Sequence, residues 1–473
     1  MLFNSLAFLI FLPLVFVTYW YLLGRVLRWQ NAFVLAASYF FYGWWDWRFL
    51  GLLIFSSCVD LFLGLAIERA TKRRKRRTWL ALSVITNLTL LGFFKYFDFF
   101  IGGFHDLLEA LGFNAHMPTL RVILPVGISF YTFQSMSYII DVYRGQVKAR
   151  RDPLVFLAFV GFFPQLVAGP IERARDLLPQ FERPRQFDPE GAKDGLRRML
   201  WGFFKKIVIA DNCADLADRI FALEASSTPG ITLFFGAFFF AFQIYGDFSG
   251  YSDIAIGCAR LFGFTLSRNF NYPYFSRSIP EFWRRWHISL STWFRDYLYI
   301  PLGGWTTRWG RWRNILITFT VSGLWHGANW TFMGWGALHG AYFLPEVVGN
   351  KRARRDLPML RDLPRILWTF FLVTLAWIFF RAATVHGALL HVVHVFINAG
   401  EHPGAVLLWL LSPQFLLIAL LVGIEWSTRR GSHALERLPR SVFMRWGLYA
   451  MITFAILLNI DLHAPHAFIY FQF

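Results

Sequence analysis

The sequence predicts an all-α polytopic membrane protein with about eleven to thirteen membrane-embedded helices, some of them re-entrant. Of its 473 residues, 56% are hydrophobic and only 16% are charged, and the mean hydropathy is positive. Apolar runs of spanning length recur from one end of the chain to the other, and the Lys and Arg residues fall between them. Because basic residues concentrate in cytoplasmic loops, the net charge of +18 indicates orientation in a membrane, and we expect no nucleic-acid partner.

The basic loops predict which helix ends face the cytoplasm. The loop from Arg69 to Arg77 contains no acidic residue and is the clearest case. Its consecutive basic residues, Lys72 to Arg77, also suit anionic membrane lipids, but orientation is the simpler role. The other segments assigned to the cytoplasm are 25–28, 144–151, much of 173–206, 268–313, 351–365 and 429–445. The segments assigned outside are poorer in basic residues, and they are 98–118, 211–230, 382–404 and 461–473.

The alternation of these loops divides the chain into spanning segments. The first segment, 6–23, has no basic residue before it and no small-residue cleavage site after it, so we expect a helix rather than a signal peptide. Segments 154–170 and 252–264 are short or interrupted by Pro and Gly, and we predict re-entrant or buried half-helices there. The remaining predicted spans are 32–48, 49–67, 79–97, 120–140, 196–212, 231–248, 314–332, 335–349, 366–380, 405–424 and 442–460. We find no internal repeat and no long polar loop, which predicts a single domain over residues 1–473.

Neither the cysteines nor the histidines have the spacing of a metal site. Cys58, Cys213 and Cys258 lie in or beside apolar segments, where we expect buried small hydrophobes and no disulfide framework. His386, His391 and His394 lie on one predicted external segment, but no cysteine or acidic residue completes a ligand set. We therefore expect no bound metal.

His326 is the strongest candidate for a catalytic residue. It lies in the apolar, aromatic-rich stretch 315–332, thirteen residues after the basic Arg313. That separation is roughly 20 Å of helix at about 1.5 Å per residue, which carries the imidazole deep into the hydrocarbon layer. An ionisable side chain at such depth is costly and marks a functional site by default.

The residues around His326 favour proton transfer. We expect Gly323 and Gly327 to leave space around the ring, and Asn329 to hydrogen-bond a nearby group or a substrate. A neutral, desolvated imidazole can take a proton from a hydroxyl group as its oxygen attacks an activated acyl group.

A second unusual region is the block 243–304, where polar residues follow an apolar span. We expect its acidic residues Asp247 and Asp253 to pair with nearby arginines, because an unpaired carboxylate at depth is strongly unfavourable. Later in the block, Trp283 and Trp286 fall on one face of a helix on which Arg284 and Arg285 supply cations.

Two interpretations of these four residues remain open. One is an interfacial helix that lies among the lipid headgroups. The other is a surface for an anionic acyl donor, in which Arg284 and Arg285 contact phosphate while Trp283 and Trp286 stack on a base. His287, within the same block, is by position alone more often a structural hydrogen-bonding residue than a catalyst.

Together these motifs resemble the membrane-bound O-acyltransferase family, and specifically its bacterial alginate O-acetyltransferase branch. The resemblance covers nearly the whole chain and is carried by residues 124–134, 163–171, 243–304, 322–330 and 468–473. It implies a ring of helices around a thinned centre, with cytoplasmic and external cavities that meet in a central tunnel. The catalytic histidine of the family maps onto His326, and a second histidine of less certain role maps onto His287.

The resemblance also implies the substrates. Acetyl-coenzyme A is the expected acyl donor on the cytoplasmic side, and no permanently bound cofactor is expected. The acetyl group is expected to reach an exported, alginate-like polysaccharide through an extracytoplasmic acetyltransferase partner of the SGNH type. In this reading the protein resides in the bacterial cytoplasmic (inner) membrane. His326 acts as general base, and Asn329 or a backbone N–H steadies the oxyanion.

Three alternatives differ in chemistry. A relative that transfers D-alanine from a carrier protein toward teichoic acid would use the same histidine with another donor. A transporter without chemistry predicts inverted repeats, and we find none. A basic membrane scaffold would need no deep histidine.

Overall fold

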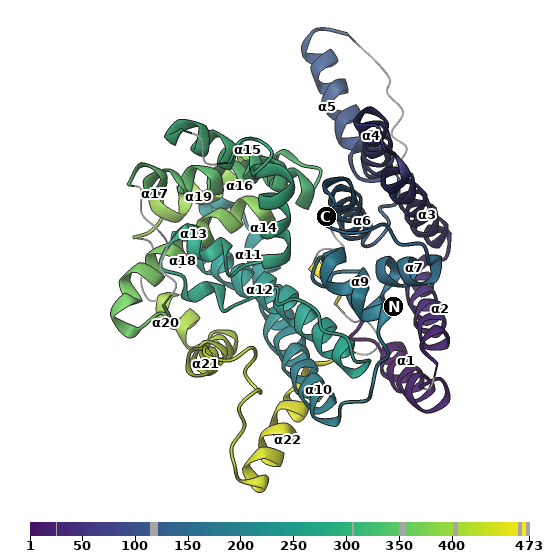
Figure 1. Cartoon of the computed structure of the whole chain (residues 1–473). Coiled ribbons are helices and arrows are strands. Elements are labelled where there is room, and N and C mark those ends of the chain that lie inside the picture. The colour runs from purple at the N-terminus through teal and green to yellow at the C-terminus, as the bar shows by residue number, and fades with distance from the viewer. Residues whose placement is uncertain are drawn as a thin grey trace. The chain divides into compact units, whose positions relative to one another are not determined.

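The regular structure is helical throughout the residues that the computed structural model describes, which are 1–24, 26–113, 122–304, 307–349, 356–400, 405–461 and 466–469 (Figure 1). The all-α polytopic membrane fold is thereby confirmed. The helices that are long and apolar enough to cross a membrane are Arg48–Arg69, Arg73–Ala110, Gly230–Leu261, Leu360–Arg381 and Val442–Asn459. Shorter apolar helices are Leu6–Leu22, Val385–Ile397 and Pro413–Thr428.

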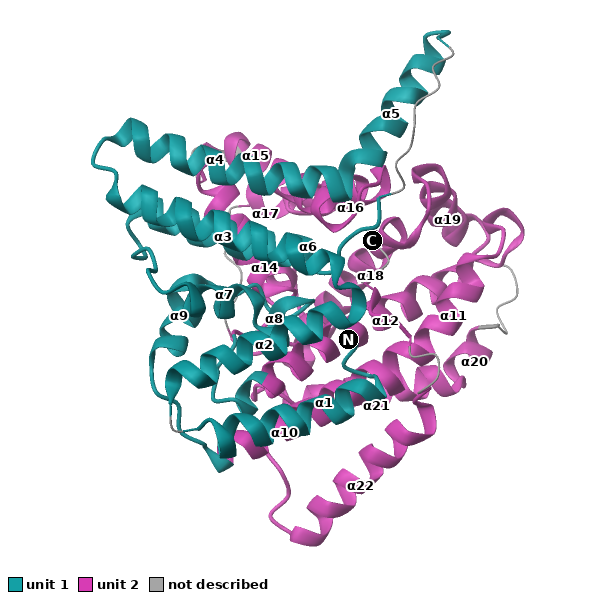
Figure 2. Ribbon diagram, turned by 90° about the vertical axis from the view of Figure 1, so that its right-hand side faces the viewer, with its two compact units in different colours: residues 1–189, 259–266 teal, residues 190–258, 267–473 magenta. Residues whose placement is uncertain are grey.

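The chain forms two compact units (Figure 2). Unit 1 consists of Met1–Pro189 and Ala259–Leu266. Unit 2 consists of Glu190–Cys258 and Ser267–Phe473 and contains all the candidate site residues. The sequence carries no composition change at these boundaries, since both units are built from the same apolar helices.

Unit 1 is held together by polar contacts between apolar helices. Asp60 on α3 accepts hydrogen bonds from Ser83 Oγ (2.5 Å) and Asn87 Nδ2 (2.9 Å) on α4. Such contacts join helices where the surroundings offer no water. The helices of this unit are α1 (Leu6–Val17), α2 (Leu27–Asp46), α3 (Arg48–Arg69), α4 (Arg73–Leu91), α5 (Phe97–Ala110), α6 (Ile128–Arg144), α7 (Pro153–Gly161), α8 (Phe163–Leu166) and α9 (Ala174–Glu182).

The helices of unit 2 begin with a continuous run of α10 (Pro189–Phe203), a π-helical segment (Phe204–Ala210) and α11 (Asp211–Phe221). The others are α12 (Gly230–Leu261), α13 (Ile279–Trp283), α14 (Ile288–Phe294), α15 (Arg308–His326), α16 (Trp330–Tyr342), α17 (Leu344–Val348), α18 (Leu363–Arg381), α19 (Val385–Ile397), α20 (Ala405–Leu410), α21 (Pro413–Thr428) and α22 (Val442–Asn459).

Several predicted boundaries are wrong, and for related reasons. The segments 231–248 and 252–264 join in the single helix α12, because Gly246 and Gly250 continue the helix where we expected a break. The span 79–97 extends from Arg73 to Ala110, since the basic and polar ends also remain helical. The segment 154–170 does divide into two short helices, α7 and α8, as predicted.

Glycines bring α10 close to α12. A Cβ atom on Gly250 would lie 2.7 Å from the carbonyl oxygen of Gly202, and one on Gly202 would lie 2.6 Å from the carbonyl oxygen of Gly250. Small residues allow such backbone approach between membrane helices. The close crossing places Lys205 beside Asp253, with 2.6 Å between Nζ and Oδ2.

We predict that Gly250→Ala destabilises the protein by about 1–3 kcal/mol, because the added methyl group overpacks this crossing. The matched control is Gly447→Ala on α22, where no heavy atom lies within 4 Å of the added Cβ. Alanine there improves helix propensity by up to about 1 kcal/mol. Thermal unfolding in detergent measures both, and equal midpoints for the two variants would contradict the close crossing.

Candidate active site

His326 is the last residue of α15, and its side chain is buried with 2% exposure. Aromatic rings surround the imidazole: the ring centroids of Trp325, Trp335 and Phe380 lie 5.0, 5.1 and 5.5 Å from its own. The helix ends here because Gly327 is extended, with φ of −158°. The imidazole therefore lies at a helix terminus inside an aromatic cluster of unit 2.

The glycines beside His326 have a different role from the one we expected. A Cβ atom on Gly323 would lie 2.1 Å from the carbonyl oxygen of Phe332, and one on Gly327 would lie 2.1 Å from the Phe332 ring. Both glycines thus allow α16 to pack directly on α15. They do not leave an open space around the imidazole.

Asn329 caps the start of α16. Its Oδ1 accepts the backbone N–H of Thr331 at 3.0 Å, and its Nδ2 donates to the carbonyl oxygen of Ala383 at 3.1 Å. This is the usual role of asparagine at a helix N-terminus. It fixes the turn that follows His326.

His287 lies beside His326, with 6.4 Å between the ring centroids. It is 1% exposed, and its ring contacts Phe248 (4.6 Å) and Trp325 (6.2 Å). The backbone of His287 is left-handed, with φ of 43°, directly before α14. Such a conformation costs roughly 1 kcal/mol or more for a residue other than glycine and is concentrated at functional sites. The two histidines of the sequence prediction are therefore brought together.

Asn269 holds His287, and we did not identify it from the sequence. Its Oδ1 lies 3.1 Å from His287 Nδ1 and accepts hydrogen bonds from the backbone N–H (3.3 Å) and Oγ (2.9 Å) of Ser289. Its carbonyl oxygen accepts the N–H of Ile288 at 2.9 Å. Asn269 lies in an irregular loop without helical periodicity, so no spacing signal connects it to His287.

A third buried histidine, His339 on α16, completes the aromatic cluster. Its Nδ1 accepts a hydrogen bond from Trp283 Nε1 at 3.2 Å, and its ring contacts Trp335 at 5.0 Å. Because an indole N–H only donates, Nδ1 of His339 carries no proton. A signal was present, since His339 lies in the predicted span 335–349.

The segment with Trp283, Arg284, Arg285 and Trp286 does not form the single helix that we considered. α13 ends at Trp283, and the chain turns before α14 begins at Ile288. Trp283 and Trp286 are 6% and 1% exposed, so neither faces headgroups or an open surface. Arg284 is exposed, whereas Arg285 is partly buried. An interfacial helix is therefore the wrong description of this segment.

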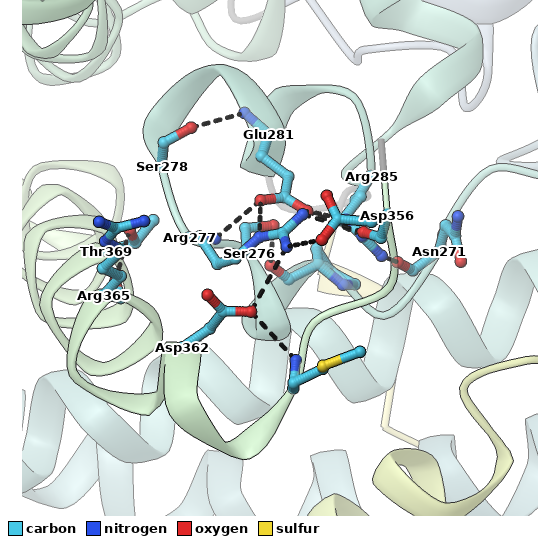
Figure 3. A network of polar contacts seen from close by, with 12 residues as sticks. Asn271, Ser276, Arg277, Ser278, Glu281, Arg285, Asp356, Asp362, Arg365 and Thr369 are labelled. Carbon is cyan, nitrogen blue, oxygen red and sulfur yellow. Dashed lines mark hydrogen bonds and ion pairs between the residues drawn. The ribbon is translucent and has the colours of Figure 1, made fainter. Parts of the chain in front are cut away.

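Arg285 belongs to an ion-pair network centred on Arg277, which Figure 3 shows. Glu281 accepts hydrogen bonds from Arg277 Nε (2.9 Å) and from Arg285 Nη2 (2.8 Å). Arg277 also pairs with Asp356 (3.1 Å) and Asp362 (3.4 Å). Burial alone would raise the pKa of Glu281, but the hydrogen bonds from Arg277 and the charge of Arg285 hold it below its usual value. The network fixes the turn that leads to His287.

The acidic residues of α12 are paired, mostly as predicted. Asp253 pairs with Arg198 (2.8 Å) as well as with Lys205. Asp247 pairs with a lysine rather than an arginine, with 2.7 Å to Lys206 Nζ. Lys206 also contacts Asp211 at 2.8 Å. Both lysines come from the π-helical segment, a rare geometry that is frequent at functional sites.

Unit 2 contains a polar cavity of about 80 Å³, two of whose lining residues are chain neighbours of rings that contact the histidine pair. Asp247 and Arg381 line it, and their chain neighbours Phe248 and Phe380 contact His287 and His326. Its other lining residues are Lys206, Ala210, Asp211, Ala214, Asp218, Gln243, His466, Ala467 and Ile469. Most of the lining residues lie in or directly beside segments that the charge pattern assigns to the external side. The exceptions are Lys206, Ala210, Gln243 and Asp247.

The C-terminal segment forms part of this cavity wall. The backbone N–H of Ile469 donates to Asp247 Oδ2 at 2.6 Å. The ring of Phe468 stacks on Tyr251, with 4.7 Å between the centroids. Residues 470–473, which contribute to the predicted family motif, lie outside the described residues.

The histidines considered for metal binding serve other contacts. His391 Nε2 lies 3.2 Å from the carbonyl oxygen of Leu233, and the ring stacks on Phe221. His394 Nδ1 lies 3.4 Å from Asn398 Oδ1. Among the described residues, His105, Asp106 and Glu109 on α5 are spaced to hold an ion. The two acidic residues are exposed, and this group is remote in sequence from the histidine pair.

Comparison with known proteins gives concordant results. The profile of the membrane-bound O-acyltransferase family matches residues 149–386, which include His287 and His326. The chain is 45% identical over 387 residues to the probable alginate O-acetylase AlgI of Azotobacter vinelandii, covering 81% of this chain and 75% of that protein. It is 35% identical over 481 aligned positions to a peptidoglycan O-acetyltransferase of Helicobacter pylori, covering 92% and 90%. A teichoic acid D-alanyltransferase of Bacillus subtilis is 30% identical over 238 residues, covering 47% and 59%.

Acid should destabilise the protein in part through His287. Burial lowers the pKa of His287, which lies outside the membrane-spanning helices, to about 3. Between about pH 6.5 and about pH 3, His287 is protonated in the unfolded chain but not in the folded protein. The free energy of unfolding therefore decreases as the pH falls through that range. We predict that His287→Gln makes stability less dependent on pH between about 7 and about 4.5. The half-exposed His105 on α5 provides the control: His105→Gln should match the wild type in thermal unfolding. Identical pH dependence in all three proteins would contradict the burial of His287.

Proposed function

Because the chain belongs to the membrane-bound O-acyltransferase family, we propose that it transfers an acetyl group from cytoplasmic acetyl-coenzyme A to a hydroxyl group presented outside, for the O-acetylation of an exported polysaccharide. The protein is a multi-pass membrane O-acyltransferase. The donor, the vectorial direction and location in the bacterial inner membrane are parts of the proposal.

The observation that carries the proposal is the position of His326. It is a buried imidazole beside a second imidazole, and its neighbour Phe380 directly precedes Arg381 on the wall of the polar cavity. A base in an apolar cluster that is joined through Phe380 and Arg381 to the wall of a polar cavity suits the removal of a proton from a hydroxyl group. In such surroundings the neutral form of the base is favoured.

The proposed reaction has two bond changes at the acetyl carbonyl carbon. His326 takes the proton of the acceptor hydroxyl while its oxygen attacks the thioester carbonyl, forming an oxyanion. The carbon–sulfur bond then breaks, the thiolate of coenzyme A leaves, and the proton held by His326 passes to that sulfur. Asn329 caps the turn after His326, and the backbone N–H groups there are the candidate donors to the oxyanion.

The donor side of the proposal rests on arginines. The exposed Arg284 lies in a loop that the charge pattern assigns to the cytoplasm, where it suits a phosphate group. Arg285 also holds Glu281, and its primary role here is structural. Trp283 and Trp286 are packed in the core, so base stacking on them would require the aromatic cluster to open.

The acceptor side of the proposal rests on the relatives and the cavity. The relatives' names refer to alginate and peptidoglycan, both polymers rich in hydroxyl groups. A cavity of about 80 Å³ is small for a polymer chain. We therefore propose that an extracytoplasmic acetyltransferase partner of the SGNH type presents one hydroxyl group and passes the acetyl group on to the polysaccharide.

D-Alanyl transfer is the alternative function. It is favoured by the similarity to teichoic acid D-alanyltransferases, but those relatives share less identity over about half of this chain. An assay that offers acetyl-coenzyme A and an alanyl carrier protein as alternative donors distinguishes the two functions.

The first prediction concerns the base. His326→Ala should lower acetyl transfer at least about 100-fold, because a general base contributes roughly that factor or more. His105→Ala, a change of a half-exposed histidine on α5 of unit 1, should retain wild-type transfer. The assay follows labelled acetyl groups from acetyl-coenzyme A in vesicles with matched expression of each protein. Undiminished transfer by His326→Ala would refute the role of His326 as the general base.

The second prediction concerns the partner. Purification in mild detergent from the native membrane should recover a hydrolase-like acetyltransferase bound to the external face, and polysaccharide acetylation should require it. The isolated chain should consume acetyl-coenzyme A slowly without the partner. Direct acetylation of polysaccharide by the isolated chain at the full rate would contradict the relay.

A further inference from the structure

We infer that Asn269 is a positioning residue that fixes His287 in the tautomer with the proton on Nδ1. In this tautomer Nε2 of His287 is unprotonated and can accept a hydrogen bond or a proton at the acyl-transfer site. This inference rests on the proposed function for its catalytic meaning. The tautomer itself rests only on the contacts of Asn269.

The first step is the orientation of the Asn269 amide. The backbone N–H of Ser289 points at one end of this amide over 3.3 Å. A backbone N–H can only donate, so the amide atom that it meets must be the oxygen Oδ1. The other end, Nδ2, donates to Ser252 Oγ at 3.2 Å, which agrees with this orientation.

The second step transfers this constraint to the imidazole. The atom of Asn269 that faces His287 Nδ1, at 3.1 Å, is the same Oδ1. An amide oxygen accepts and never donates, so the hydrogen bond exists only when Nδ1 carries the proton. In a neutral ring the lone pair is then on Nε2, the nitrogen on the far side of the ring.

The third step is the rigidity of the arrangement. Asn269 is 0% exposed, and its carbonyl oxygen accepts the N–H of Ile288 at 2.9 Å. Two residues on, the N–H of Asn271 donates to the carbonyl oxygen of Arg285 at 2.8 Å. The segment around Asn269 is thus clamped on both sides of His287. These contacts also support the left-handed backbone of His287.

The surroundings of His287 keep the ring neutral. Phe248 from α12, Phe270 from the loop before α13, and Trp325 and His326 from α15 contact it. Of these groups only His326 is titratable. Burial lowers the pKa of His287 to about 3, so the tautomer rather than the protonation state determines its behaviour near neutral pH.

The consequence is a division of roles. A neutral His287 with its lone pair on Nε2 cannot donate a hydrogen bond to an oxyanion. It can accept one from a hydroxyl group that approaches His326. His339 has the opposite tautomer, because Trp283 Nε1 donates to its Nδ1. The hydrogen-bond partners of His287 and His339 therefore fix opposite tautomers in these two buried histidines.

The experiment measures the tautomer directly. The full-length protein, labelled with ¹⁵N at histidine, is placed in lipid bilayers, and the His287 signals are identified as those lost in His287→Gln. We expect a protonated Nδ1 and an unprotonated Nε2 in the wild type, and loss of this pattern in Asn269→Ala. Asn314→Ala, which removes another fully buried asparagine, should leave the His287 signals unchanged.

Kinetics separate positioning from a merely structural role. Asn269→Asp keeps an oxygen acceptor and adds a negative charge, so it should retain the tautomer and raise the pKa of His287. We expect about 100-fold lower kcat with little change in KM for Asn269→Ala. For Asn269→Asp we expect substantial recovery of kcat, with the acidic limb of its pH profile moved to higher pH.

The outcomes distinguish this inference from the proposed function. A protonated Nε2 on His287 in the wild type, or an unchanged tautomer in Asn269→Ala, would overturn the inference whatever the activity. A correct tautomer in a protein that transfers no acetyl group would instead overturn the proposed function. Equal kcat losses in Asn269→Ala and Asn269→Asp, with identical pH profiles, would show that Asn269 is structural only.

Discussion

The structure of the site depends on how an ionisable ring is kept neutral inside an apolar cluster. His326 and His287 are 2% and 1% exposed, and aromatic rings from α12, α15, α16 and α18 enclose them. A charged imidazole in these surroundings would lose its hydration, which is costly. The cluster therefore favours the neutral form of His287. A neutral ring with a defined lone pair is the form that can accept a proton from a hydroxyl group.

The charged residues of unit 2 are arranged around this cluster rather than in it. Lys206 is shared by Asp211 and Asp247, and Lys205 is bound by Asp253. Removing one partner of such a buried pair typically costs about 3–5 kcal/mol, because the other charge is left uncompensated. The pairs of Lys206 thus hold part of the wall of the polar cavity, and through Asp247 they also hold the C-terminal segment.

The sequence predicted the fold class and the two histidines, but not the contacts that position them. The depth of His326 followed from its distance to Arg313, and the membrane class followed from composition. Glycine was the main source of error. We expected glycines to interrupt helices or to leave space around His326, whereas they allow neighbouring helices to pack closely. Gly323, Gly327 and Gly250 allow helices to touch, and this depends on which helix lies opposite.

Asn269 and the two tryptophans of the Arg-rich block also depend on contacts that no local pattern predicts. Asn269 acts through one side-chain oxygen that reaches His287 across a turn, and no periodicity links the two positions. Trp283 and Trp286 were assigned to a helix face, whereas the chain turns at Arg284 and buries both rings. Local patterns thus identify residue types suited to chemistry, and the tertiary packing determines which of them meet.

The central claim is that one buried imidazole acts as the base while an acetyl group passes from a donor in one aqueous compartment to a hydroxyl group in the other. The most direct measurement uses the protein reconstituted with its partner in sealed vesicles, with labelled acetyl-coenzyme A on the side of the loop from Arg69 to Arg77 and a hydroxylated acceptor on the other. Our account predicts labelled ester on the opposite side and free coenzyme A retained on the donor side. Ester that forms only in the donor compartment, or coenzyme A that crosses with the label, would contradict it.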